Sequence, residues 1–122
     1  MLQHELLRDR GILILKPNGA LRAEDFTALA AAVDPYIEQN GKLNGLMIEA
    51  PSFPGWENFA ALLSHLRFVR DHHRQIRRIA VVSENPLLAA LPKIASHFIS
   101  AQVRTFAAND RAAALAWIDA DS

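Results

Sequence analysis

The chain has 122 residues, no cysteine, and 13 basic against 13 acidic side chains, so its formal net charge is zero. This length suits a single domain over residues 1–122, and the 51% hydrophobic content suits a filled core. The missing cysteines exclude disulfides, zinc–thiolate sites, iron–sulfur clusters and thiol catalysis. The lack of a basic excess argues against nucleic acid as the main partner.

The first residues, Met1 to Glu5, lack the basic and apolar stretches of a signal peptide. No apolar run approaches the roughly 20 residues that a membrane-spanning helix needs. We therefore expect a cytoplasmic protein.

Hydrophobic periodicity predicts the elements of the first half of the chain. Strands are expected at 2–8, 12–15 and 46–48, and a helix at about 23–40. The short turn around Gly11 suits an antiparallel hairpin between the first two strands. Pro35 is expected to kink or divide the helix near Asp34.

The second half repeats the alternation of helix and strand. Helices are expected at about 57–73, at 86–99 with a break at Pro92, and from about 109 onwards, with strands at 79–82 and 103–106. Continuous apolar strands indicate a sheet that is covered on both faces. The order predicts an α/β fold: a mixed five-stranded sheet, antiparallel at its N-terminal hairpin and parallel elsewhere, with about four helices on both faces.

The expected helix at 57–73 carries large side chains on two faces. Its predicted inner face consists of Phe59, Leu62, Leu63, Leu66 and Val69. Phe68 falls opposite this stripe, beside His65 and His72. It is either an ordinary exposed phenylalanine or, with the two histidines, part of a dimer surface, a membrane contact or a lid. The two histidines stand two helical turns apart, whereas metal pairs usually stand one turn apart, so we expect no metal site.

A run of arginines follows the same helix: Arg67, Arg70, Arg74, Arg77 and Arg78. One interpretation is a solvated face that also favours the C-terminus of that helix. The other is attraction to phosphate or to anionic lipid head groups.

Five segments in a fixed order resemble the SpoIIAA-like family, which is related to the STAS domains. They are Gly-Ala-Leu-Arg-Ala-Glu-Asp-Phe at 19–26, Phe-Pro-Gly-Trp at 53–56, Arg-Ile-Ala-Val-Val at 78–82, Val-Arg-Thr-Phe at 103–106 and Ala-Leu-Ala-Trp-Ile at 114–118. The resemblance implies a small mixed sheet between helices, similarity to the CRAL-TRIO lipid-binding fold, and an apolar cavity under movable cover helices. It implies no catalytic residue.

The chain departs from the family pattern in two places. Arg22 stands where the family often has threonine, and arginine cannot accept the capping hydrogen bond at a helix start. The Asp-Ser-Ser-Gly-like switch of anti-sigma factor antagonists is missing, and the nearest serine is Ser52.

The sequence predicts a binding site where the third strand ends, because ligands of open α/β sheets usually bind at the carboxyl edge of the strands. The expected ligand-binding residues are Glu49, Ser52, Phe53, Trp56, Phe59, Leu88, Leu91 and Phe98. The aromatic and leucine side chains would wall an apolar pocket, and Glu49 and Ser52 would supply polar contacts. The leucine-rich segment 87–99 would act as its gate. The alternative is that the rings pack the turn onto the core.

The chain lacks glycine-rich phosphate loops, nucleophile elbows and close acidic pairs in an apolar setting, so we expect neither an enzyme nor a cofactor. The sequence therefore predicts a module that binds a small apolar or amphipathic molecule and contacts membranes reversibly. The alternative is a regulatory protein-interaction module that resembles anti-sigma factor antagonists and docks through Phe68. A homodimer is compatible with either function.

Overall fold

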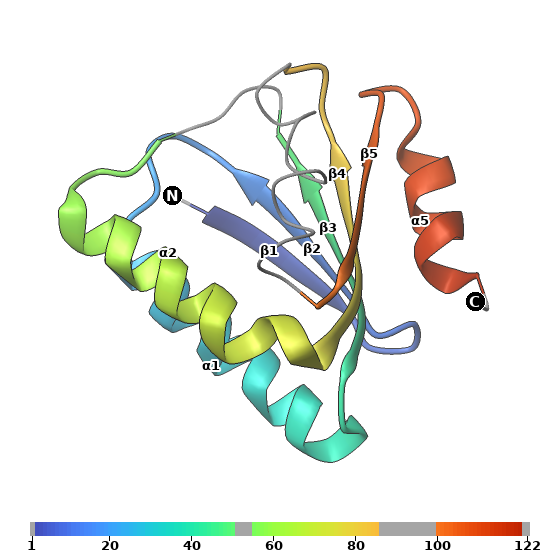
Figure 1. Ribbon diagram of the computed structural model, residues 1–122, viewed down its shortest axis with the longest axis horizontal. Helices are drawn as coiled ribbons and strands as arrows, with labels where there is room; N and C mark the ends of the chain where they lie inside the picture. Colours follow the sequence, from blue (N-terminus) through green and yellow to red (C-terminus); the bar gives the residue numbers. More distant parts are fainter. Residues whose placement is uncertain (1, 51–54, 86–99, 121–122) are drawn as a thin grey trace.

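The computed structural model describes residues 2–50, 55–85 and 100–120, and these form one five-stranded sheet with α-helices on both faces (Figure 1). The strands are β1 (Leu2–Leu7), β2 (Ile12–Pro17), β3 (Leu43–Glu49), β4 (Ile76–Val82) and β5 (Gln102–Phe106). The helices are α1 (Ala23–Asn40), α2 (Phe59–His72) and α5 (Arg111–Asp119), and a 3-10 turn, η1 (His73–Gln75), joins α2 to β4.

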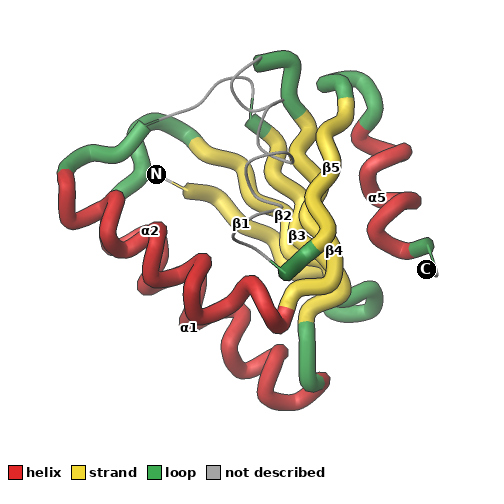
Figure 2. The backbone as a smooth tube through the Cα atoms, viewed as in Figure 1, coloured by secondary structure: helices red, strands yellow, loops and turns green. Residues whose placement is uncertain are grey.

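The strands lie in sequence order, β1-β2-β3-β4-β5. β1 and β2 pair antiparallel, and every other pair is parallel, which confirms the predicted mixed sheet. One row of aligned residues crosses the four parallel strands: Leu13, Leu46, Ile79 and Val103. Helices α1 and α2 lie on one face of the sheet and α5 lies on the other (Figure 2).

The central strands are buried on both faces, as their continuous apolar sequences predict. In β2, Leu13 and Leu15 pack into a cluster with residues of α1, including Leu29. Ile12 and Ile14 point the other way, into a cluster with Ile118 of α5. The sheet therefore has two cores, one on each side.

Helix α1 runs without interruption through Pro35, so the expected division near Asp34 is wrong. Proline removes only one hydrogen bond of the helix, and Pro35 lies on the exposed side, while Val33 and Ile37 hold the opposite side in the core. The start of α1 lacks a capping side chain at Arg22. Instead, the carboxylate of Asp25 accepts a hydrogen bond of 2.8 Å from the Arg22 backbone N–H.

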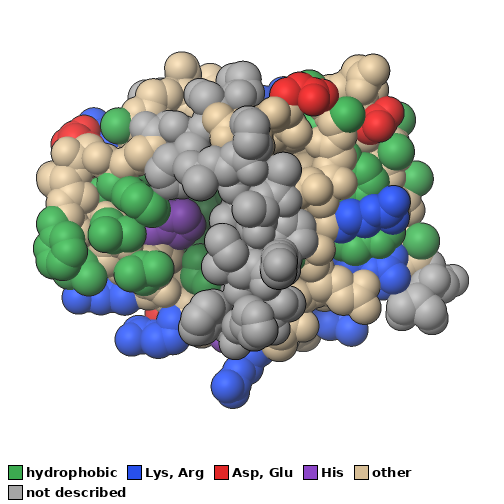
Figure 3. Space-filling view, turned by 45° about the horizontal axis from the view of Figure 1, so that its top comes forward, with side chains coloured by type: hydrophobic (Ala, Val, Ile, Leu, Met, Phe, Trp, Pro, Cys, Tyr) green, Lys and Arg blue, Asp and Glu red, His purple; other side chains and the backbone are tan. Residues whose placement is uncertain are grey.

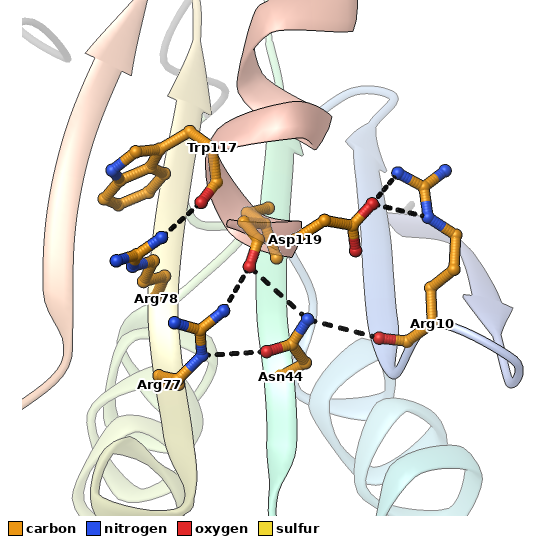
Figure 4. Close-up of polar contacts among 7 residues, drawn as sticks. Arg10, Asn44, Arg77, Arg78, Trp117 and Asp119 are labelled. Atoms are coloured by element: carbon orange, nitrogen blue, oxygen red, sulfur yellow. Dashed lines mark hydrogen bonds and ion pairs between the residues drawn. The ribbon is translucent and has the colours of Figure 1, made fainter. Parts of the chain in front are cut away.

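The C-terminus of α5 is held by basic side chains from the sheet (Figure 4). The Arg78 guanidinium donates to the carbonyls of Trp117 and Ala120, and Arg77 donates to the carbonyl of Ile118. Arg78 is buried and also lies 5.1 Å from the centre of the Trp117 ring. The predicted solvated face at the end of α2 is therefore wrong for these two arginines, which stabilise the negative end of α5.

A glycine in β3 lets α5 approach the sheet closely. A Cβ atom added to Gly45 would lie 2.1 Å from Cγ2 of Ile118, well inside contact distance. Ile118 is fully buried, so its side chain has little room to withdraw.

We expect Gly45→Ala to lower the free energy of unfolding by about 1–3 kcal/mol, because the methyl group overpacks this contact. Urea unfolding measures the loss. Ile118→Ala removes the opposing atoms, so the double variant should lose clearly less than the sum of the two single variants. Additive losses would show that the added methyl group at position 45 does not clash with Ile118.

Candidate functional site

An apolar cavity of about 340 Å³ lies between α2 and the sheet, on the face opposite α5. Its floor is formed by β3, β4 and β5, through Leu46, Ile48, Ile79, Val81 and Val103. Its walls include Phe26 and Leu29 of α1, Trp56, and His65, Phe68, Val69 and His72 of α2. Among the described residues that line it, none is an aspartate, glutamate, lysine or arginine. Its volume lies within the range of small-molecule sites.

Helix α2 is rotated relative to the sequence prediction. Phe59 and Leu66, expected on its inner face, are 71% and 56% exposed. His65, Phe68 and His72, expected on the outer face, line the cavity instead. These three side chains therefore do not form an exposed interface, and the alternative that they belong to a lid stays a prediction. The expected orientation rested on the assumption that the hydrophobic stripe faces a packed core. The signal that was missed is Ala61, which is fully buried: a small side chain lets α2 approach its neighbour closely.

Trp56 and His65 form the first of two ring contacts along the inner side of α2. The Trp56 Nε1–H donates a hydrogen bond of 3.1 Å to Nδ1 of His65. The His65 ring also stacks on Phe26, with centroids 4.8 Å apart and planes at 16°. Because indole can only donate, Nδ1 of His65 must accept, and the neutral ring therefore carries its proton on Nε2.

The segment that carries Trp56 is tied to the segment before α1. Leu21 donates through its backbone N–H to the Gly55 carbonyl at 2.9 Å, and Glu57 donates to the Leu21 carbonyl at 2.7 Å. Gly55 adopts a φ of 74°, a conformation that glycine tolerates without strain. α2 itself begins at Asn58, whose side chain accepts from the Ala61 N–H at 2.9 Å. These bonds fix the place where Trp56 enters the cavity wall.

The second ring contact lies within α2 at its far end, where His72 also contacts Asp34 of α1. Phe68 stacks on His72 with centroids 4.0 Å apart. Nε2 of His72 lies 2.6 Å from an Asp34 carboxylate oxygen, and Nδ1 lies 2.7 Å from the Phe68 carbonyl. Each ring nitrogen of His72 therefore lies within hydrogen-bond distance of an oxygen that can accept.

The remaining predicted site residues do not meet at the cavity. Glu49 lies on the opposite side of β3, where its carboxylate accepts a hydrogen bond of 2.8 Å from Arg111 of α5. It is therefore not the expected polar contact in the pocket, because successive side chains of a strand alternate between faces and its neighbours Ile48 and Ala50 line the cavity. Ser52, Phe53, Leu88, Leu91, Phe98 and the expected gate at 87–99 lie outside the described residues.

Over the ranges 2–50, 55–85 and 100–120, no three histidine or acidic side chains are grouped so that they could hold a metal ion. No helix within these ranges is long and apolar enough to cross a bilayer.

Burial lowers the pKa of His65 from its ordinary value of 6.5. The unfolded chain therefore binds a proton near pH 6.5 that the folded chain does not bind until lower pH. We expect the free energy of unfolding to fall as pH drops through this window, and His65→Gln to remove part of that fall. Urea unfolding from about one unit above pH 6.5 to about one unit below measures both.

The matched control is His4→Gln, because His4 is an exposed histidine on β1. It should leave the pH dependence as in the wild type. An unchanged slope in His65→Gln would show that His65 titrates alike in the folded and unfolded chains.

Both the sequence and the fold of this chain are similar to those of known proteins. Residues 12–119 match the sequence model of the SpoIIAA-like family. The fold is similar to the crystal structure of an uncharacterised DUF3478 family protein with a SpoIIAA-like fold from Shewanella loihica PV-4, with a TM-score of 0.70. The two share 19% identity over 97% of this chain and 92% of that chain. No curated protein matches the sequence.

Proposed function

The chain belongs to the SpoIIAA-like family, and we propose that it is a non-catalytic module that binds a small hydrophobic or lipid-like molecule beneath α2. The observation that carries the proposal is the cavity of about 340 Å³ with no charged side chain among its described lining residues. An apolar hollow leaves its walls without contacts on one side, so a hydrophobic molecule that fills it gains dispersion contacts and leaves water.

The described lining offers little that would support catalysis. Of its histidines, His65 accepts from Trp56 and His72 contacts Asp34 and the Phe68 carbonyl. No serine, threonine, lysine or acidic side chain stands among the described lining residues to act as a nucleophile beside them. Glu49, the carboxylate singled out in the sequence, pairs with Arg111 on the other face. These features support binding over reaction.

The proposal can be tested by a substitution that fills the cavity from its floor. Val103 is half-buried on β5 and lines the cavity, so Val103→Phe should occupy part of the volume. Wild-type protein should carry a hydrophobic molecule that solvent extraction releases and native mass spectrometry detects. It should also melt at a higher temperature with added fatty acid or phospholipid. Val103→Phe should lose both effects.

The matched control is Leu115→Phe, which adds a ring to α5 on the opposite face of the sheet. It should keep the bound molecule and the shift in melting temperature. If the wild type carries no hydrophobic molecule and no lipid shifts its melting temperature, the proposed binding function fails.

The outer face of α2 favours reversible membrane contact as a second activity. Phe59 and Leu66 are its large exposed hydrophobic side chains, and Arg67 and Arg70 lie exposed on the same helix. Hydrophobic side chains gather on the left of the molecule, where α2 lies (Figure 3). Apolar side chains beside basic ones suit the surface of an anionic bilayer.

We expect Phe59→Ser with Leu66→Ser to weaken binding to anionic vesicles, measured by flotation, and to leave ligand binding in the cavity intact. Neutral vesicles serve as the control lipid, because they lack the charge that attracts the arginines. The rival function, a regulatory module, would use this same surface to bind a protein, since Phe68 lies inward. Vesicle binding that persists in the double variant would rule out this surface as the membrane contact.

A further inference from the structure

His65 brings to the cavity a hydrogen-bond donor whose tautomer is fixed by its surroundings. Nδ1 of His65 accepts from Trp56, and the ring packs flat on Phe26. The proton therefore resides on Nε2, which has no hydrogen-bond partner among the described residues. An imidazole N–H in an apolar wall favours a ligand that brings an acceptor, because a donor left without a partner after desolvation costs free energy.

The same surroundings favour an uncharged acceptor. Burial keeps His65 neutral by lowering its pKa. Nδ1 of His65 already accepts a hydrogen bond from the Trp56 N–H, so its lone pair is not free to bind a proton. The described lining residues also include no arginine or lysine that could pair with an anion. A carboxylate placed beside a neutral imidazole in this hollow would lose its hydration without gaining an opposite charge.

A second histidine presents the same tautomer at the other end of α2. The backbone N–H of Ser100 donates to Nδ1 of His73 at 3.1 Å, so the neutral His73 ring also carries its proton on Nε2. His73 lines the cavity too, but it lies in η1, beyond the end of α2, and not beside Trp56. It is therefore the natural comparison for His65.

Resting on the proposed binding function, we infer that the cavity selects uncharged hydrophobic molecules with a carbonyl group, such as ketones, aldehydes or esters, which accept a hydrogen bond from Nε2–H of His65. The hydrophobic part of the ligand lies over Ile48, Ile79 and Val103, and its oxygen lies at the Trp56 end of α2. Ionised fatty acids bind this site more weakly than uncharged carbonyl compounds of the same length.

Three probes of equal length test the inference: a medium-chain methyl ketone, the alkene in which a methylene group replaces its oxygen, and the fatty acid at neutral pH. Calorimetric titration of the wild-type chain should give about five- to tenfold tighter binding of the ketone than of the alkene, the gain from one hydrogen bond. The fatty acid should bind more weakly than the ketone. Nitrogen NMR should show the Nε2–H tautomer of His65, with its proton signal shifted by the ketone.

His65→Phe keeps a ring that can stack on Phe26 and removes the donor, so it should bind the ketone and the alkene equally. His73→Phe should retain the preference for the ketone. If no probe binds the wild type, the proposed binding function itself fails. If the alkene binds as tightly as the ketone, if the fatty acid binds more tightly, or if only His73→Phe loses the preference, binding stands and the inference is overturned. The NMR readout needs no variant and tests the tautomer even where His65→Phe does not fold.

Discussion

Helix α2 is held in place by α1 more than by the sheet beneath it. Phe26 of α1 packs against two rings of α2, His65 at 4.8 Å and Phe68 at 6.2 Å between centroids. At the other end, Asp34 of α1 binds His72 of α2. A helix supported from its side needs no continuous contact with the strands, and this arrangement leaves the hollow between α2 and the sheet.

The two faces of the sheet are packed differently: the face under α2 contains the cavity, whereas the face under α5 is closely packed. On the α5 face, the approach of Ile118 to Gly45 leaves no room for a methyl group. Arg77 and Arg78 bind the carbonyls at the end of that helix, so α5 is fixed by both packing and hydrogen bonds. The strands that form the cavity floor are therefore backed by a closed core. A ligand would meet a preformed wall on that side, which lowers the entropic cost of binding.

Much of the fold could be predicted from the sequence, because burial on two faces leaves a clear signal. Three short apolar runs predicted β2, β3 and β4, the segment 103–106 predicted β5, and the stop at Asn40 and Gly41 predicted the end of α1. The strands proved longer than expected, since β3 begins at Leu43 and β4 at Ile76. Polar residues such as Asn44 and Arg77 hid these extensions, because they pair with each other at 2.8 Å inside the structure.

The candidate site was predicted less well, for a physical reason. Trp56 was expected at the pocket and lies in its wall, but α2 is rotated from the expected orientation, so that Phe59 and Leu66 are exposed. Val69, also expected on the inner face, does line the cavity. Hydrophobicity alone cannot orient a helix that faces a hollow and a neighbouring helix, because leucines there do not gain the burial that they gain in a filled core. The inner face is instead set by the ring stacking and hydrogen bonds of His65, Phe68 and His72. A pattern of hydrophobic residues carries no information about these contacts.

This arrangement makes the polarity of the cavity depend on residues at its edge. Trp56 fills part of the wall, and its N–H also decides which nitrogen of His65 carries the proton. Asp34 engages Nε2 of His72 from outside, so that nitrogen is occupied and does not serve a ligand. The imidazole of His65 can therefore donate to a ligand, whereas that of His72 cannot, although both lie on the same face of α2. Selectivity in such a site would arise from hydrogen bonds made before any ligand enters, and a substitution at Trp56 would alter it by freeing the tautomer of His65.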